Sequence, residues 1–177
     1  MFRPILLIAL FFIAIQSGAQ LSVIKMVGND TKDYKPGAGL YLKAGYPVSE
    51  GDDITIEAGC YLFSLYNNSF EYGTIVIPGK VGYRYTINRE GNGFYVEPQV
   101  GYNIYGSSTL NVNGYAKDFR YHGLVLGAGT GYLFSLWSAP LDLNLHYETI
   151  MDKGGSNNYV RLGLVFPFRL KKRESDE

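Results

Sequence analysis

The chain has 177 residues, which suits one domain, and its 16 basic and 16 acidic residues give a formal net charge of zero. No basic patch stands out before the C-terminal tail, so nucleic acid is not an expected partner. Charged residues make up only 18% of the chain, whereas glycine (22) and tyrosine (16) are abundant, and this bias predicts an all-β fold.

The first 19 residues have the character of a secretory signal peptide. Arg3 supplies the positive start, and an unbroken apolar run follows from Ile5 to Ile15. That run is too short to span a membrane comfortably, since about 20 residues are needed. Small residues at 17–19 precede the expected cleavage before Gln20. We therefore predict three parts, which are a signal peptide (1–19), a main domain (20–170) and a charged tail (171–177).

Eight runs of alternating apolar and polar residues follow the signal peptide. A period of two is typical of a strand whose two faces meet different surroundings. The first run alternates poorly, and Pro78 interrupts the fourth, where a long strand accommodates a proline at a bulge. The predicted strands are residues 21–28, 37–48, 54–66, 72–87, 94–105, 121–134, 141–150 and 159–169.

The connections between these runs alternate in length along most of the chain. Three polar segments are long, namely Asn29–Pro36, Gly106–Phe119 and Asp152–Asn158, whereas the link at 67–69 is an exception because it is short. Long loops at one rim and short turns at the other are typical of outer-membrane barrels. An even number of strands then puts both termini at the short-turn, periplasmic side and makes the three long segments extracellular loops.

The alternating run Leu141–Glu148 raises the question of which strand face lies inside. The polar faces of all the runs together carry four basic and four acidic residues. Such groups are costly in lipid but pair inside a narrow barrel, and eight strands enclose just enough room for side chains to fill. We predict a lumen filled by a neutral charge network, with glycines making room for it. Its members are Lys43, Glu57, Lys80, Arg84, Glu97, Asp142, His146, Glu148 and Arg161.

A soluble barrel of lipocalin type, with the apolar rows inside and the charged rows in water, is the alternative. Against it, the apolar rows hold large residues such as Leu40, Leu42 and Phe166 at nearly every position, and eight such rows would overfill a small core. The opposite rows are rich in glycine, which a solvated face does not need. The runs also have about 10 to 15 residues, long enough to cross a bilayer. We therefore predict an eight-stranded antiparallel up-and-down transmembrane β-barrel.

The last strand resembles the C-terminal assembly signal of outer-membrane proteins. That signal has a polar residue, a glycine two positions later, and aromatic or apolar residues at the fifth and seventh positions after the polar one. The matching residues are Arg161, Gly163, Phe166 and Phe168. The resemblance implies recognition by the barrel-assembly machinery. The chain departs from the usual pattern because the tail Arg169–Glu177 follows the strand.

Further motifs resemble the outer-membrane β-barrel domain family of Gram-negative bacteria, which includes small barrels of OmpA or OmpX type. They are Ile77-Pro78, then Lys80 with Tyr83 and Tyr85, then Phe94-Tyr95-Val96-Glu97 through Gly101-Tyr102, and only the lysine-to-tyrosine spacing departs slightly. The resemblance covers essentially the whole mature chain. It implies a location in the outer membrane, with membrane lipids and lipopolysaccharide as partners, and it provides no catalytic residues to carry over.

The sequence predicts an architecture and a location more specifically than an activity. The first hypothesis is a non-enzymatic barrel with a structural role or with a surface partner at the long loops. The alternative is a barrel that binds or transports a small or hydrophobic ligand, with a cavity beside Gly127, Gly129 and Gly131. The second alternative is a lipid-modifying enzyme, for which His146 with Glu148 is the one candidate cluster, although no serine is near on the same strand. No metal-ligand spacing, phosphate loop or dinucleotide motif is present, so no cofactor is predicted.

Overall fold

The computed structural model describes residues 16–28, 35–64, 73–88, 93–112, 115–136, 139–153 and 155–168. No helix in these residues is long and apolar enough to cross a membrane. They form antiparallel strands, which are β1 (Gln16–Val27), β2 (Gly37–Ser49), β3 (Asp52–Ser64), β4 (Gly73–Thr86), β5 (Gly93–Val112), β6 (Tyr115–Arg120), β7 (Gly123–Leu136), β8 (Ala139–Asp152) and β9 (Gly155–Phe168).

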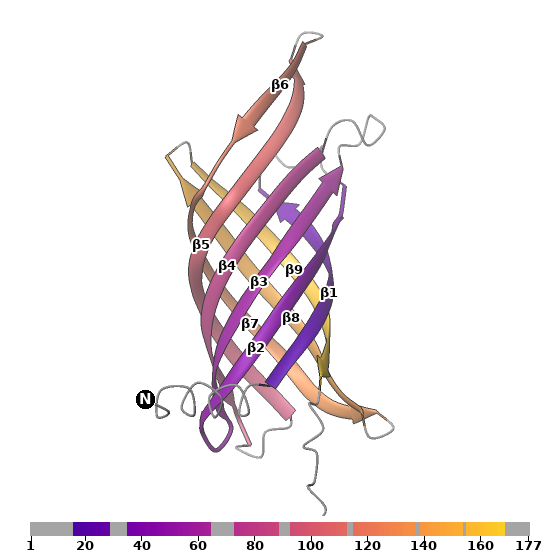
Figure 1. The fold of residues 1–177 in the computed structure, drawn as a ribbon, viewed down its shortest axis with the longest axis vertical. Coiled ribbons are helices and arrows are strands. Elements are labelled where there is room, and N and C mark those ends of the chain that lie inside the picture. The colour runs from indigo at the N-terminus through magenta and orange to yellow at the C-terminus, as the bar shows by residue number, and fades with distance from the viewer. Residues whose placement is uncertain are drawn as a thin grey trace, which may run out of the picture.

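All of the strands except β6 close into a barrel (Figure 1). Neighbours in the sequence pair antiparallel, β5 pairs with both β4 and β7, and β1 pairs with β9 to close the ring. Closure satisfies the backbone hydrogen bonds of every strand in the wall and leaves it without an open edge. The predicted eight-stranded antiparallel up-and-down barrel is confirmed.

The strands of the barrel place their polar residues inside. In β8, Leu143 is 46% exposed, whereas the next residue, Asn144, is 1% exposed. β4 repeats this pattern, with Ile75 and Val81 on the outer surface and Lys80 buried. The soluble alternative with its apolar rows inside is therefore wrong, because the side chains that it would bury are on the outside.

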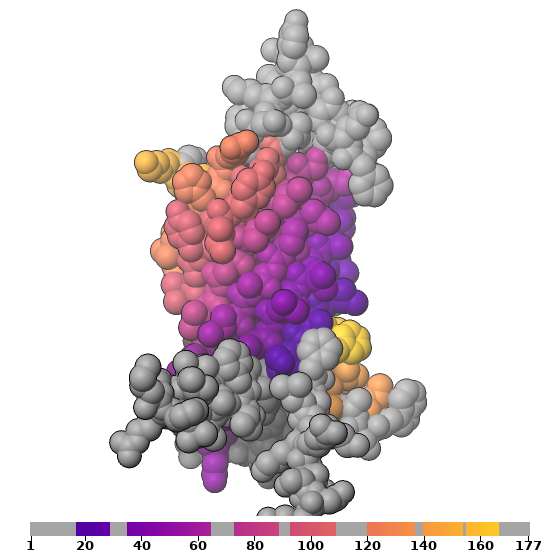
Figure 2. Space-filling view, viewed as in Figure 1, coloured from indigo at the N-terminus to yellow at the C-terminus, as the bar shows by residue number. Residues whose placement is uncertain are grey.

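The outer surface of the barrel is apolar around its circumference. Figure 2 shows the front of this wall, where β2, β3 and β4 present a continuous surface between the two ends. Burying apolar surface in lipid contributes about 25 cal/mol per Å² relative to water, so this exterior strongly favours a bilayer. Outward residues on this wall include Leu40, Leu42, Ile54, Ile56, Val81, Val100, Ile104, Leu124, Leu126, Leu145 and Leu162.

The two ends of the barrel differ in their connections. β2 ends at Ser49 and β3 begins at Asp52, at the end of the barrel where β1 begins and β9 ends. At the opposite end, β5 and β6 form a hairpin that projects beyond the rim (Figure 1). Short turns mark the periplasmic end of such barrels, so the hairpin lies at the extracellular end.

Two of the three segments predicted as extracellular loops are mostly strand, although both lie at the end opposite the short β2–β3 turn. Most of Gly106–Phe119 is strand, because β5 continues to Val112 and pairs with β6. The Asn113-Gly114 step in the sequence is a strong hairpin signal that accounts for this pairing. Most of Asp152–Asn158 is also strand, because Asp152 pairs with Gly155, whose positive φ of 142° suits a tight turn. Residues 29–34 of the remaining predicted loop, Asn29–Pro36, and the link at 67–69 lie outside the described residues.

Two details concern the predicted strand boundaries. β1 begins at Gln16 rather than Leu21, so its first four residues, 16–19, fall within the predicted signal peptide. Residues 1–15 and the tail lie outside the described residues, and the division of the chain stays a prediction. The bulge expected at Pro78 is confirmed, because Ile77 pairs with Tyr105 and Pro78 with Asn103, which leaves Ile104 as the extra residue.

Candidate functional site

The lumen of the barrel is the candidate functional site. The predicted network residues come from β2, β3, β4, β5, β8 and β9, and each of them faces inward with at most 8% of its surface exposed. Alternation explains this placement, because a residue two positions along a strand returns to the same face. The residues that meet in the lumen are Lys43, Glu57, Lys80, Arg84, Glu97, Asp142, His146, Glu148 and Arg161.

Four of these residues form a ring of alternating charge, which we call the central quartet: Glu57, Lys80, Glu148 and Arg161. Lys80 Nζ lies 2.8 Å from Glu57 Oε1 and 2.6 Å from Glu148 Oε1. Arg161 lies 2.7 Å from Glu57 Oε1 through Nη1 and 3.0 Å from Glu148 Oε1 through Nη2. Each carboxylate thus meets two cations, which offsets the cost of taking these charges out of water.

Tyrosines complete the surroundings of the quartet. The Tyr61 hydroxyl donates to Glu148 Oε2 and accepts a hydrogen bond from Lys80 Nζ at 3.3 Å. The guanidinium carbon of Arg161 lies 4.3 Å from the ring centroid of Tyr41, in cation–π geometry. The quartet is therefore held by aromatic side chains as well as by its own charges.

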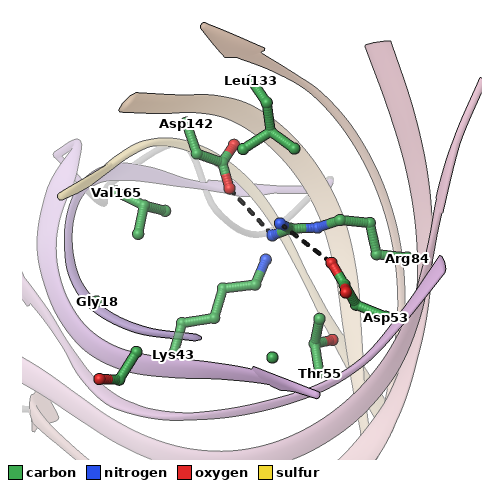
Figure 3. Close-up of a pocket in the computed structure, with 10 residues that line it drawn as sticks. Gly18, Lys43, Asp53, Thr55, Arg84, Leu133, Asp142 and Val165 are labelled. Atoms are coloured by element: carbon green, nitrogen blue, oxygen red, sulfur yellow. Dashed lines mark hydrogen bonds and ion pairs between the residues drawn. The ribbon is translucent and has the colours of Figure 1, made fainter. Parts of the chain in front are cut away.

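A second group lies nearer the periplasmic end, and we call it the mouth cluster: Lys43, Asp53, Arg84, Glu97 and Asp142. Lys43 Nζ lies 2.6 Å from Glu97 Oε2, and Arg84 Nη2 lies 3.0 Å from Asp142 Oδ2. Arg84 also approaches Glu97 at 3.6 Å and Asp53 at 4.0 Å. Figure 3 shows Arg84 between Asp53 and Asp142, with Lys43 reaching towards them from β2.

Neutral residues around the mouth cluster donate hydrogen bonds to its carboxylates. Thr55 Oγ1 donates to Glu97 Oε1 at 2.6 Å, and Tyr95 Oη donates to Asp142 Oδ1 at the same distance. A cavity of about 50 Å³ remains between them. Its lining includes Gly18, Lys43, Asp53, Thr55, Arg84 and Asp142.

Glycines of β7 leave space for the side chains of neighbouring strands. A Cβ atom on Gly129 would lie 2.3 Å from His146 Nδ1, and one on Gly131 would lie 2.5 Å from Tyr95 Oη. A Cβ on Gly127 would lie 3.3 Å from Glu148 Cγ. These glycines border packed side chains on their lumenal side, where the ligand hypothesis expected a cavity.

His146 differs from the rest of the network because its side chain makes no ion pair or hydrogen bond with the described residues. Its ring is fully buried, and neither ring nitrogen has a hydrogen-bond partner among the described residues. Glu148, two residues away, is bonded to Lys80, Arg161 and Tyr61 instead. A catalytic base needs a partner that orients it, so this geometry provides no support for the lipid-modifying enzyme. Within the described residues no group of His, Cys, Asp and Glu could hold a metal ion.

Sequence reasoning missed two parts of the lumen. One is Asp53, which lies just before the predicted strand 54–66, in the short connection after residue 48, although it shares the inward face of Thr55 and Glu57. The other is an apolar layer at the extracellular side of the quartet, formed by Ile24, Met26, Phe63, Val76, Val125, Ile150 and Tyr159. The signal was present in the alternation, since Ile150 lies two residues beyond Glu148 on the same face.

The residues of the predicted assembly signal all lie in β9. Arg161 and Gly163 face the lumen, Phe166 faces outward, and Phe168 pairs with Ser17 of β1. Arg161 therefore also makes two ion pairs inside the barrel. Recognition of these residues by the assembly machinery stays a prediction.

The closed ring of strands, with its apolar exterior and polar lumen, defines the small membrane-spanning barrels of the outer-membrane type. No protein-family model and no curated protein matches the chain. Among solved structures it is similar to Ail, the attachment invasion locus protein of Yersinia pestis, with a TM-score of 0.59 and 16% identity over 87% of this chain and 96% of that one.

Two further structures share the fold. The N-terminal β-barrel domain of Pseudomonas aeruginosa OprF has a TM-score of 0.56 and 12% identity, over 86% of this chain and 97% of that one. Neisserial surface protein A has a TM-score of 0.55 and 14% identity, over 88% of this chain and 97% of that one. At these identities the likeness shows the fold alone, and it agrees with the predicted outer-membrane resemblance and location.

Proposed function

We propose that the protein is a non-enzymatic outer-membrane barrel with a side-chain-filled lumen that does not conduct ions. Its role is to reinforce the cell envelope or to contact surface partners at its extracellular rim. The observation that carries the proposal is the central quartet, in which two cations and two carboxylates bridge the lumen.

The quartet connects strands that lie far apart around the ring. In the order β4-β3-β2-β1-β9-β8-β7-β5, Lys80 comes from β4 and Glu148 from β8, while Arg161 comes from β9 and Glu57 from β3. These ion pairs therefore cross the lumen instead of running along one side of it. An ion that passed would have to separate buried charge pairs, at a cost of several kcal/mol for each pair broken.

Conductance measurements test this proposal. The purified full chain is inserted into planar lipid bilayers, and the current is recorded across a range of voltages, with a general porin as the positive control. We expect no stepwise current above that of the bare bilayer. Sustained single-channel steps from the unmodified chain would contradict a filled lumen and favour the conduit hypothesis.

The exterior and the last strand support two further parts of the proposal. The apolar outer surface fits contact with outer-membrane lipids and lipopolysaccharide, and Phe166 lies on that surface. Recognition by the barrel-assembly machinery is tested with Phe166→Ala and Phe168→Ala, for which we expect less heat-modifiable barrel in outer-membrane fractions. Leu145→Ala, an outward change on β8, is the matched control and leaves assembly unchanged.

The non-enzymatic part of the proposal is supported by the lack of an orienting partner for His146. It is tested by mass spectrometry of lipid A from cells that carry the intact chain or the His146→Ala variant. We expect identical spectra, and a modification lost only in the variant would favour the enzyme hypothesis.

A surface role is supported by the β5–β6 hairpin, because it projects past the rim where a partner would meet it (Figure 1).

A further inference from the structure

The lumen has a polar periplasmic part and a mostly apolar extracellular part, in which Thr74 and Ser108 are hydrogen-bonded to each other and Asn103 to a backbone oxygen. We propose that water enters the lumen from the periplasm as far as His146 and no farther, so that the barrel holds a dead-end, periplasm-facing vestibule with this histidine at its inner end. The proposal rests on the proposed function in that the barrel spans the outer membrane with its short turns in the periplasm. It adds that the filled lumen is wet on one side only.

The vestibule begins at the cavity in the mouth cluster (Figure 3). About 50 Å³ is free there, beside the charged groups of Lys43, Arg84 and Asp142. A site needs only about 10–15 Å³ and two to four polar partners to hold a water molecule. The side chain of Asp53 is 20% exposed at this end, which places the cavity next to bulk solvent. The mouth cluster is therefore a hydrated entrance.

Polar side chains continue inward from the entrance on two strands. On β8 the inward face carries Asp142, Asn144 and then His146, at every second residue and thus about 7 Å apart. On β1, Gln20 lies two residues beyond Gly18 of the cavity lining. Gln20 Nε2 donates to Asn144 Oδ1 at 3.0 Å, so the two rows meet.

Several polar atoms along these rows have no partner within the described part of the chain. They are Gln20 Oε1, Asn144 Nδ2 and both ring nitrogens of His146, and all of them are buried. An unsatisfied buried polar group costs about 1–3 kcal/mol, and ordered water commonly supplies the missing bond. These atoms form a path that binds water from the mouth cluster to the imidazole. Other buried atoms without a hydrogen-bond partner, such as Asn103 Oδ1, lie outside these two rows, so the end of the path is set by the apolar layer.

The apolar layer closes the path on the extracellular side. Beyond Ser22, the inward face of β1 carries Ile24 and Met26, and beyond Glu148 that of β8 carries Ile150. The Phe63 ring packs 5.7 Å from that of Tyr159 and 6.4 Å from that of Tyr61, measured between ring centroids. Water finds few polar partners among these side chains, so the layer acts as a seal.

The charges around His146 explain why access from one side matters. Arg161 of β9 is the register partner of His146, and Gly129 of β7 packs against its ring. Lys43 of β2, Glu57 of β3 and Glu97 of β5 are the other charged groups that face it. On its own strand, the inward residues are Asp142 and Asn144 on the periplasmic side of His146 and Glu148 on the other side. Most of these charges are already paired with one another. A proton that reached His146 would add a positive charge to paired groups, and in this arrangement it arrives from the periplasm.

Cysteine labelling in sealed proteoliposomes tests the vestibule. In a Cys60→Ser background, Thr55→Cys probes the entrance and Val76→Cys probes the apolar layer. Glu50→Cys and Lys153→Cys, in the turns at the periplasmic and extracellular ends, report the side from which the reagent comes. The probe is a small, charged, membrane-impermeant methanethiosulfonate, and heat-modifiable gel mobility confirms that each variant is folded.

We expect the Thr55→Cys thiol to react only when the Glu50→Cys thiol reacts, and more slowly than it, because Thr55 is only 1% exposed and is reached through the cavity that it lines. We expect the Val76→Cys thiol to react at least about a hundredfold more slowly from either side. Labelling of the Thr55→Cys variant from the Lys153 side, or no labelling of it at all, would overturn the vestibule. Labelling of the Val76→Cys variant as fast as the Thr55→Cys variant would overturn the seal.

A second measurement uses the intact chain, which has only two histidines. In nanodiscs with isotope-labelled histidine, we expect NMR exchange peaks between water and the ring of His146, as well as those of the exposed His122. If water contacts His122 alone, the path does not reach His146. This failure is distinct from failure of the proposed function, which would appear as channel steps together with labelling of the Val76→Cys thiol from both sides.

Discussion

The two faces of the barrel wall use one strand pattern for two different kinds of packing. On β8, Leu143 and Leu145 face outward, whereas the residue that follows each of them, Asn144 or His146, is buried. The outer residues need only be apolar, because fluid lipid chains adapt to their shape. The inner residues need specific partners, because a buried charge or polar group without a partner costs free energy. Substitutions on the two faces should therefore fail for different reasons.

The largest effect is expected at Arg161, which contacts both carboxylates of the central quartet. The Arg161→Ala variant leaves Glu57 and Glu148 with Lys80 as their main cation, and we expect a loss of about 3–5 kcal/mol in the free energy of unfolding. Urea unfolding in lipid vesicles, followed by the fluorescence of the one tryptophan, Trp137, measures it. The neighbouring outward change, Leu162→Ala, should cost about 1–2 kcal/mol, and equal losses would contradict the comparison.

A charge on the outer face is the second test. The Leu145→Arg variant puts a guanidinium where the wall meets lipid, and such a change costs about 2–4 kcal/mol near the bilayer centre. The Leu145→Phe variant keeps the surface apolar and should unfold at nearly the same urea concentration as the intact chain. If the arginine were tolerated as well as the phenylalanine, this part of β8 would not face hydrocarbon.

Overpacking of the inner face is the third test. Gly129→Ala places a methyl group in the space that the His146 ring occupies, and we expect a loss of about 1–3 kcal/mol. Ala128→Val adds bulk to the preceding residue, which faces lipid, and should change stability little. A double-mutant cycle with His146→Ala should recover most of the Gly129→Ala loss, and an additive result would show that the ring is not the obstacle.

The smallest effect compares one chemical change on both faces. Thr55 Oγ1 donates to the Glu97 carboxylate inside the barrel, whereas Thr130, on the outer face, donates to the backbone oxygen of Tyr95. Thr55→Val should cost about 1.5–3 kcal/mol because it removes a hydrogen bond to a charged group, and Thr130→Val about 0.5–1.5 kcal/mol. The same urea titration measures both, and a larger loss for the Thr130→Val variant would reverse the comparison.

The assignment of residues to faces could be predicted from the sequence because alternation is local. Lys80 and Arg84 lie four positions apart in one run, so they must share a face, and lipid excludes that face. The ion pairs could not be predicted, because Lys80 meets Glu148 only through the register of every strand between β4 and β8. The lack of a partner for His146 is also a matter of three-dimensional packing, since it depends on how the ring lies against Gly129.

Other parts were missed for more particular reasons. The apolar layer was missed because the inner face was expected to be polar throughout, whereas Ile150 continues the row of His146 and Glu148. The β5–β6 hairpin was missed because its polar composition was taken for a loop, although Asn113-Gly114 favours a two-residue turn. Asp53 was missed because charged residues beside a glycine are more typical of turns than of strand ends.

The seam between β1 and β9 has a consequence for how the barrel forms. Ser17 pairs with Phe168 and Val27 with Asn158, so β1 is paired only with β2 until β9 is in place. Every other seam of the wall joins segments much closer in sequence, and contacts of long sequence separation slow folding because their loop-closure entropy is paid first. Closure should therefore be the late, rate-limiting event, and changes confined to this seam should alter the rate of folding more than changes of equal cost between β3 and β4.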